Sequence, residues 1–379
     1  MKYFLIFFFL TSLFGCHSAD TTREIPSGLS HSSQKLIKVG VFNGDGAGAV
    51  SVIETIEALK IDQEIEAFPI SAAEIVSGKL NEIDVIIFPG GSGSKQLNNL
   101  GYAGQNKVKE FVRNGKGIIG ICAGAYMLCN TPTYPSLKLA HVKHLDRAHY
   151  NRGRGLIEFK LNKEGLKIFP EFKNKPQFIQ YYDGPIMEAL EQQPDFHPLA
   201  VYVTDIHPNE GTPAGLTPGK LFMYYQQVGK GRIFAIGGHA ESTPGIRWMI
   251  PRMVRIVSGK KLISYDKKWI APERNHQPIL FDKNLIKTEK RLWWKLLKAN
   301  EKEKLAAMDS LYELRSRPAV RWNIGLLRDS SAIIRAHAAN LLKKSEYTHA
   351  LNDLKAAVKM ETRTQTKDTL IEVIEFFEK

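Results

Sequence analysis

Three short apolar runs, each followed by small or glycine-rich residues, constrain the fold of this chain more than any other feature. They lie at residues 36–42, 85–88 and 117–120. Short apolar runs of this kind are typical of strands buried on both faces of a sheet. Residues 49–59 and 106–114, which lie between the runs, have the apolar spacing of helices. Alternating strands and helices predict parallel strands joined by right-handed crossovers, with functional loops at the carboxyl ends of the strands.

Later segments complete this pattern. Residues 232–236 predict another buried strand and residues 246–258 a closing helix, so we place the α/β domain at residues 36–262. The segment 131–198 is irregular and contains many Pro, Lys and aromatic residues, which favours antiparallel additions to the sheet. The expected fold class is α/β, a flavodoxin-like three-layer sandwich with a mostly parallel sheet.

The C-terminal quarter of the chain has a different pattern of apolar and polar residues. After a polar, proline-containing linker at residues 263–282, residues 283–379 show helical spacing of apolar residues. Residues 329–339 resemble the start of a HEAT-type repeat, in which a capped helix carries Arg and small residues. Repeats of this type predict a small all-α domain that binds a protein partner. A plain helical bundle that braces the first domain is the alternative.

The N-terminus predicts export. Lys2 is followed by an apolar run at residues 3–10 and then by Cys16 directly after a small residue. The run is shorter than the roughly 20 residues of a membrane-spanning helix. We therefore predict a lipoprotein signal peptide at residues 1–16, lipid on Cys16 and a flexible tether at residues 17–35. The expected location is the bacterial cell envelope, lipid-anchored to a membrane in the periplasm or at the outer membrane. An ordinary secretory signal or a retained N-terminal anchor is the alternative.

The charge is strongly basic, with 52 Lys and Arg against 39 Asp and Glu and a formal net charge of +13. Such an excess favours anionic partners. It is spread along the chain without a dense basic block or an aromatic-basic motif, so we do not expect a nucleic-acid partner.

No metal or other cofactor is expected. Four residues could ligate a metal by type, namely His141, His144, Asp146 and His149. They lack a standard zinc spacing, which favours a polar loop. The run at residues 44–48 is glycine-rich but lacks the dinucleotide fingerprint and the Lys-Ser/Thr of a P-loop. We interpret it as a turn beside the substrate.

Cys122 is the strongest candidate for chemistry. It follows a buried strand and lies between Gly120 and Gly124, small residues that allow the crowded backbone of a nucleophile elbow. Cys129 lies one predicted helix away, about 10 Å along the axis, which exceeds disulfide reach. A free thiol in an exported protein suggests chemical use. A structural cysteine and a redox-sensing cysteine remain alternatives.

Two further features supply partners for this thiol. His239 and Glu241 follow the last strand, and residues i and i+2 of an extended segment project to the same side. Glu241 would then orient His239, and His239 would act as the base for Cys122. The turn at Gly90 and Gly91 follows another buried strand, and its bare N–H groups suit an oxyanion.

These pieces, in this order, resemble class I glutamine amidotransferases, and most closely the amidotransferase-like domain at the N-terminus of biotin-protein ligases. The likeness rests on residues 39–42, 120–126, 181–185 and 229–232. The resemblance implies a catalytic triad of Cys122, His239 and Glu241 and an oxyanion hole at Gly91 and Ala123. It also implies pocket residues, which are Gly90, Asn43, Asp45, Tyr126, Tyr182 and Asp183.

The sequence departs from the family at Ala240, where the family has Pro, and we find no synthetase or ligase catalytic domain in the remaining residues. We therefore expect a thiol-dependent hydrolase or transferase that acts on an amide or ester of a small-molecule or peptide-like substrate. The alternative is a non-catalytic module that binds a ligand in the pocket and a protein through the helical repeats.

Overall fold

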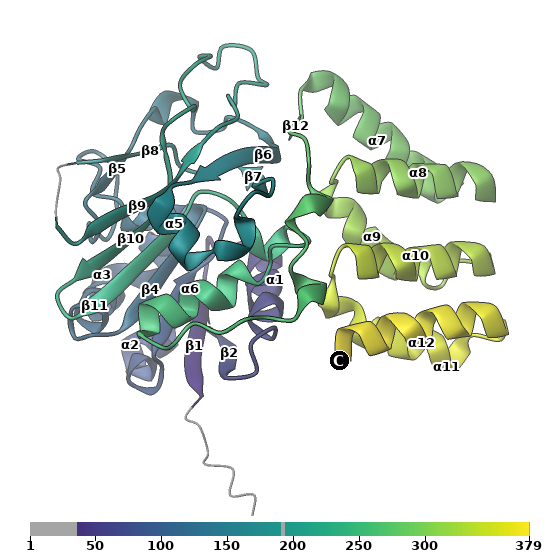
Figure 1. Ribbon diagram of the computed structural model, residues 1–379, viewed down its shortest axis with the longest axis horizontal. Coiled ribbons are helices and arrows are strands. Elements are labelled where there is room, and N and C mark those ends of the chain that lie inside the picture. The colour runs from purple at the N-terminus through teal and green to yellow at the C-terminus, as the bar shows by residue number, and fades with distance from the viewer. Residues whose placement is uncertain (1–35, 191–193, 379) are drawn as a thin grey trace, which may run out of the picture. The chain divides into compact units, whose positions relative to one another are not determined.

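The apolar runs form the central strands of one sheet (Figure 1). The computed structural model describes residues 36–190 and 194–378. The predicted signal peptide, Cys16 and the tether lie outside the described residues. The parallel part of the sheet has the order β2-β1-β3-β4-β11. Its strands are β1 (Ile37–Phe42), β2 (Ile65–Ile70), β3 (Val85–Phe88), β4 (Gly117–Ile121) and β11 (Gly231–Ile236).

The segment between β4 and β11 extends the sheet with antiparallel strands, as predicted. From β11 the order continues through β10 to β9 and β6, while β7 and β12 both pair with β6, and β8 pairs with β10 and β5. The strands between β4 and β11 are β5 (Val142–His144), β6 (Arg154–Leu161), β7 (Phe178–Tyr182), β8 (Met187–Ala189), β9 (Phe196–Tyr202) and β10 (Leu221–Val228), and β12 (Ile279–Leu280) comes from the later linker. The sheet is therefore mixed and parallel around the predicted site.

Helices cover both faces of the parallel strands because side chains alternate along them. In β3, Val85 and Ile87 join one buried cluster and Ile86 and Phe88 the other. Helices α1 (Ala49–Leu59) and α6 (Met249–Ser258) pack on the first face. On the second face lie α2 (Ala72–Ser77), α3 (Gly93–Arg113) and α4 (Ala123–Leu128), and α5 (Lys163–Ile168) packs near β9. This arrangement confirms the α/β class of the domain.

Two local expectations were incomplete. The helix expected at residues 106–114 is only the second half of α3, which kinks at Gly101 with φ 61°. Strand β2 and helix α2 were not predicted. Strand β2 lies at the sheet edge, contains Pro69 and is only partly buried, so it lacks the apolar run that marks the central strands.

Short 3₁₀ turns lie at Lys79–Glu82, Arg147–His149, Pro170–Phe172, Ala240–Ser242, Lys267–Trp269, Pro272–Arg274 and Thr348–Ala350.

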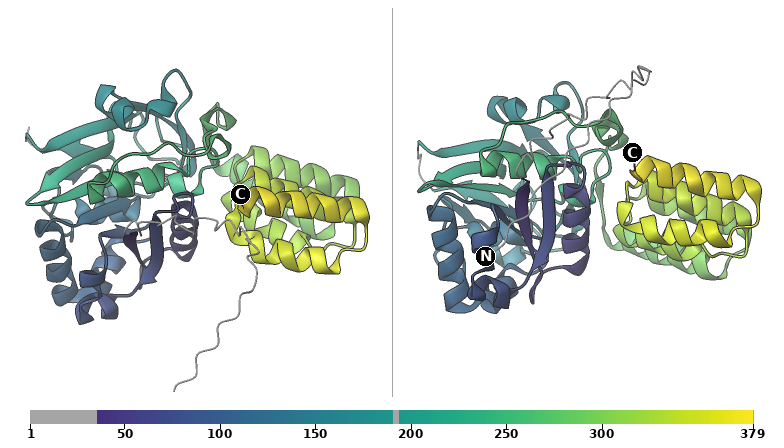
Figure 2. Two further views of the ribbon diagram at one scale, coloured as in Figure 1. Left: turned by 60° about the horizontal axis from the view of Figure 1, so that its bottom comes forward. Right: turned by 90° about the horizontal axis from the view of Figure 1, so that it is seen from below.

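The C-terminal region is helical, as expected. Neighbouring helices run side by side in Figures 1 and 2 and share a buried apolar cluster that includes Leu296, Leu311 and Leu342. The helices are α7 (Lys283–Lys298), α8 (Glu301–Glu313), α9 (Arg317–Leu326), α10 (Ala332–Lys344), α11 (Leu351–Met360) and α12 (Thr364–Glu378). In the described part of the chain, no helix combines the length and apolarity that crossing a membrane requires.

The linker packs against the α/β domain more closely than a polar connection suggests. It places β12 beside β6, and it buries Trp269 and Phe281 to 7% and 2% exposure. The described residues from Leu36 onward consequently form one compact unit. Contacts between the α/β and helical regions therefore lie within this one unit.

Candidate active site

Cys122 lies in a tight turn between β4 and α4. Its backbone has φ 51° and ψ −102°, outside the regions that most residues favour, and its N–H donates to the Ile236 carbonyl at 2.9 Å. A Cβ on Gly124 would lie 2.0 Å from the Phe88 carbonyl oxygen, and one on Gly120 would lie 2.7 Å from the Gly124 carbonyl oxygen. The turn therefore requires glycine on both sides of the cysteine, which is the geometry of a nucleophile elbow.

His239 and Glu241 lie side by side after β11. Nδ1 of His239 is 2.7 Å from Oε1 of Glu241, and the two residues are 3% and 0% exposed. The contact forms through the 3₁₀ turn Ala240–Ser242 and not through the extended segment expected from the sequence. The His239 N–H donates to the Gln180 carbonyl at 2.8 Å, which fixes the backbone at the base.

The two side chains hold opposite charges. Burial lowers the pKa of His239, but the Glu241 carboxylate and the Cys122 sulfur outweigh burial and raise this pKa to about 9. Burial raises the pKa of Glu241, but its contacts with His239 and Arg317 outweigh burial and hold that pKa below its usual value. At neutral pH the pair is therefore an imidazolium and a carboxylate.

Nε2, the second ring nitrogen of His239, is available to Cys122. Among the described residues, Nε2 of His239 has no hydrogen-bond partner. The Cys122 thiol donates to the Tyr182 carbonyl at 3.2 Å. Both side chains line the same cavity.

The turn after β3 lines this cavity and leaves one backbone N–H group outside its hydrogen bonds. Gly91 forms an antiparallel bridge with Ala47, flanked by hydrogen bonds of Gly48 and Ser92. Residues at the centre of such a flanked bridge do not exchange hydrogen bonds with each other, so the bridge leaves the Gly91 N–H unused. Gly91 has φ 136°, and a Cβ there would lie 2.2 Å from the Gly46 carbonyl oxygen, so only glycine fits.

Ala123 supplies a second donor by its position. It is the first residue of α4, where backbone N–H groups have no partner within the helix. Ala123 and Gly91 both line the cavity beside Cys122. The two residues suggested as an oxyanion hole therefore line the same cavity as Cys122.

Ser51 is a site residue that sequence reasoning missed. Its hydroxyl donates to Oε1 of Glu241 at 2.8 Å and accepts from the Gly90 N–H at 3.0 Å, so it joins the glycine turn to the triad. Ser51 lies in the first turn of α1, and its contact with Glu241 spans 190 residues. No local pattern in the sequence signals such a contact.

We expect Ser51→Ala to destabilise the fold by about 1–3 kcal/mol, because it leaves the buried Gly90 N–H without a partner and takes one hydrogen bond from Glu241. Urea unfolding measures this change. Ser310→Ala, which removes an exposed hydroxyl in α8 far from both of these hydrogen bonds, is the comparison. Equal stability of Ser51→Ala and the wild type contradicts the bridging role.

The cavity around Cys122 has a volume of about 780 Å³. Of the predicted pocket residues, the structure places Gly90, Tyr126, Tyr182 and Asp183 in its wall. Its remaining lining residues are Gly48, Ala49, Val50, Ser51, Gly91, Ser92, Gly93, Ser94, Cys122, Ala123, Tyr134, Pro135, His144, Arg147, Tyr150, Asn151, His239 and Arg317. Tyr126 donates to the Asp183 carbonyl at 3.2 Å, so helix α4 and the turn after β7 are joined.

Asn43 and Asp45 do not line this cavity. Both are exposed, and the Asp45 N–H bonds to the side chain of Asn99 in α3. The bridge at Gly91 closes the glycine-rich turn, so the cavity wall begins only at Gly48. The prediction that the loop after β1 lines the pocket is therefore correct for Gly48, at the end of the loop, and wrong for Asn43 and Asp45.

His144 and His149, two of the four residues that could ligate a metal by type, contact neighbouring side chains. His144 contacts the Thr131 hydroxyl at 2.8 Å, and burial, with a smaller contribution from Arg147, lowers its pKa to about 4. His149 contacts Asp146 at 2.7 Å. Across residues 36–190 and 194–378, no three His, Cys, Asp or Glu side chains group as metal ligands.

Arg317 is the second residue that the sequence did not reveal. It comes from the first turn of α9, in the helical region, yet it lines the cavity of Cys122. Its Nη2 atom lies 2.7 Å from Oε2 of Glu54 and 3.7 Å from Oε1 of Glu241. The candidate site therefore draws on both regions of the chain.

Residues 37–139 match the family model described as biotin-protein ligase, N terminal. Two curated relatives are the PdxT subunits of pyridoxal 5'-phosphate synthase. The protein from Bacillus cereus is 27% identical over 171 residues, which cover 42% of this chain and 79% of that protein. The protein from Bacillus mycoides is 26% identical over 195 residues, which cover 45% and 90%. These similarities support an amidotransferase-like domain.

Solved structures of low identity also match. A putative ThuA-like protein from Parabacteroides merdae is 12% identical, and the match covers 64% of this chain and 100% of that chain with a TM-score of 0.44. A second putative ThuA-like protein, from Bacteroides uniformis, is 14% identical and covers 62% and 94% with a TM-score of 0.38.

Proposed function

We propose that this chain is a thiol-dependent hydrolase or transferase that acts on an amide or ester, with Cys122 as nucleophile, His239 as base and Glu241 as the orienting carboxylate. The observation that carries the proposal is the 2.7 Å contact between His239 and Glu241, with the other ring nitrogen unpartnered in the cavity of Cys122. This is the arrangement in which a carboxylate fixes the tautomer of a base beside a nucleophile.

The first half of the reaction forms a thioester. Cys122 reacts as a thiolate whose proton is already on Nε2 of the His239 imidazolium, and the sulfur attacks the substrate carbonyl carbon to form a C–S bond. The Gly91 and Ala123 N–H groups donate to the oxyanion that develops. His239 then returns the proton to the leaving nitrogen or oxygen as its bond to carbon breaks.

The second half releases the acyl group. His239 takes a proton from water, or from an acceptor hydroxyl or amine, while that molecule attacks the thioester carbonyl. The C–S bond breaks, and the proton stays on His239 beside the regenerated Cys122 thiolate. Glu241 keeps its charge throughout and stabilises the imidazolium.

Trapping the thioester tests this proposal. The full mature chain is mixed with p-nitrophenyl acetate and, separately, with a panel of amino-acid and peptide amides that includes glutamine, and each reaction is quenched in acid. We expect peptide mass spectrometry to locate the acyl group on Cys122. Acylation distributed over lysines, with none on Cys122 for any probe, contradicts the proposal.

A second candidate is a non-catalytic module that binds a ligand in the cavity and a protein through the helices. The contact that favours it is the hydrogen bond from the Cys122 thiol to the Tyr182 carbonyl, which occupies the thiol proton with a backbone group. In that case a ligand would bind equally well to the wild type and to Cys122→Ala, and no acylated protein would accumulate.

The finer architecture belongs to this proposal as well. A flavodoxin-like sandwich would present the site at the carboxyl ends of its parallel strands, and HEAT-like helix pairs would bind a protein partner. Support comes from the parallel order β2-β1-β3-β4-β11 and from the successive contacts of α8, α9, α10 and α12.

Export and lipid anchoring complete the proposal. We expect Cys16→Ala to move the protein from the membrane fraction of a bacterial host to the soluble fraction and to abolish labelling with a palmitate analogue. Cys129→Ala, which changes a buried thiol, should leave labelling unchanged. Equal labelling of the Cys16→Ala variant and the wild type contradicts lipid attachment at Cys16.

A further inference from the structure

We propose that the helical region completes the active site, with Arg317 of α9 as a positioning residue that holds Glu241 and balances the negative charge behind Cys122 and His239. This inference rests on the proposed function. It assigns a role in catalysis to a region that the sequence suggested only as a repeat for protein binding or as a brace.

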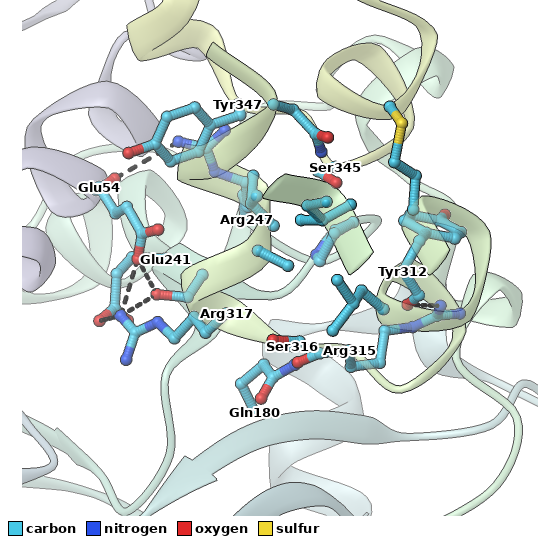
Figure 3. Close-up of a pocket in the computed structure, with 18 residues that line it drawn as sticks. Glu54, Gln180, Glu241, Arg247, Tyr312, Arg315, Ser316, Arg317, Ser345 and Tyr347 are labelled. Carbon is cyan, nitrogen blue, oxygen red and sulfur yellow. Dashed lines mark hydrogen bonds and ion pairs between the residues drawn. The ribbon is translucent and has the colours of Figure 1, made fainter. Parts of the chain in front are cut away.

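The geometry places Arg317 between two carboxylates. Nη2 contacts Glu54 of α1 at 2.7 Å, the Ser242 hydroxyl beside the triad, and Glu241 at 3.7 Å. Figure 3 shows the Arg317, Glu54 and Glu241 side chains directed toward one another. Because Ser242 also donates to Glu54, the four side chains form one connected network.

The network is buried, so its charges matter. Glu54 is 6% and Glu241 0% exposed, and 15% of the Arg317 side chain is accessible. Burial lowers the pKa of Arg317, but the two carboxylates outweigh burial and raise it. Two buried carboxylates beside one another are costly unless a cation lies between them, and an arginine remains charged at every accessible pH.

The start of α9 is tied to the strand that holds His239. The Gln180 amide of β7 donates to the Arg315 carbonyl at 3.1 Å, while the Gln180 carbonyl accepts from the His239 N–H. The Ser316 hydroxyl donates to Glu289 at 2.6 Å, and Glu289 pairs with Arg154 of β6. These contacts fix the residues directly before Arg317 against the α/β domain.

Arg317 lines two cavities. One is the 780 Å³ cavity of Cys122, and the other is a smaller one of about 40 Å³ between the two regions. The smaller cavity is lined by Glu241 and by helical residues such as Leu311 and Tyr347. The arginine thus forms the wall behind the triad, where a simple brace would need only apolar contacts.

Loss of the Arg317 charge changes the proton affinity of nearby groups in a predictable direction. Removing a fixed positive charge raises the proton affinity of every nearby group, and removing a negative charge lowers it. Arg317 interacts electrostatically with Glu54, Cys122, His239, Glu241 and Tyr347, while Arg247 and Arg321 act on Tyr347. Loss of Arg317 must therefore make the Cys122 thiolate harder to form.

The test is the pH dependence of Cys122 alkylation by iodoacetamide in the full mature chain, read by peptide mass spectrometry. We expect Arg317→Met to move the midpoint of the rate profile upward by about half to one pH unit, equivalent to a roughly three- to tenfold slower reaction below the midpoint. Arg317→Lys keeps the charge and should restore most of the shift. Arg321→Met, one turn along α9 and exposed, is the matched control and should leave the midpoint in place.

A second variant keeps the test decisive if Arg317→Met does not fold. Glu54→Gln removes a negative charge from the same network and should move the midpoint downward. The inference is overturned if the midpoint is unchanged in Arg317→Met or in Glu54→Gln while His239→Gln does shift it relative to the wild type. If His239→Gln has no effect either, the proposed Cys-His pair itself is wrong, which distinguishes the two failures.

Discussion

Cys122→Ala is expected to abolish acyl transfer, lowering the rate by on the order of 10⁴-fold or more on any amide or ester that the wild type cleaves. The loss is this large because the sulfur forms the covalent bond and no other described thiol reaches the cavity. Stopped-flow or product-release assays on substrates that acylate the wild type measure the effect.

Cys129→Ala is the matched control for that experiment. Cys129 is fully buried one helix away, and burial raises the pKa of its thiol to about 12, so it has no role as a nucleophile. Its removal should leave the rate per folded molecule unchanged. If Cys122→Ala retains the wild-type rate, the enzyme interpretation is lost and the ligand-binding alternative gains support.

Gly124→Ala is expected to cause the largest loss of stability among single methyl additions at the site. The new Cβ would lie 2.0 Å from the Phe88 carbonyl oxygen, so β3 and α4 would have to separate. We expect the free energy of unfolding to fall by about 3 kcal/mol, the upper end of the usual cost of overpacking. Because Cys122 directly precedes α4, alkylation of the thiol should change as well.

Gly325→Ala provides the comparison. Gly325 lies in α9, and no atom lies within 4 Å of the position that a methyl group would take there, so the added group meets open space. Alanine is favoured over glycine in helices, and we expect a gain of about 0.5–1 kcal/mol. Chemical unfolding of both variants gives the two changes. If Gly124→Ala proves no less stable than Gly325→Ala, the close packing of the elbow is contradicted.

Features with a local signal could be predicted from the sequence. The run before Cys122 contains only apolar residues and glycine, because β4 is buried on both faces and the turn after it is crowded. His239 and Glu241 are two residues apart, so their contact depends on a single turn. The antiparallel middle of the sheet and the helical C-terminal region also followed from residue patterns.

Long-range contacts could not be predicted in this way. Ser51 reaches Glu241 across 190 residues, and Arg317 reaches Glu54 across 263. Neither residue lies in a motif, and each owes its place to how α1 and α9 pack on the sheet. Asn43 failed as a pocket residue for the same reason, because the closure of the loop by Gly91 is a tertiary contact.

The most direct measurement of the central claim is the NMR titration of His239 in selectively labelled wild type and Cys122→Ala, with the signal assigned through His239→Gln. The structure raises the pKa of His239 to about 9 through Glu241 and Cys122 together. We predict a titration near that value in the wild type and a lower pKa in Cys122→Ala, because the thiolate partner is gone. An identical pKa in the two proteins contradicts a Cys122–His239 pair.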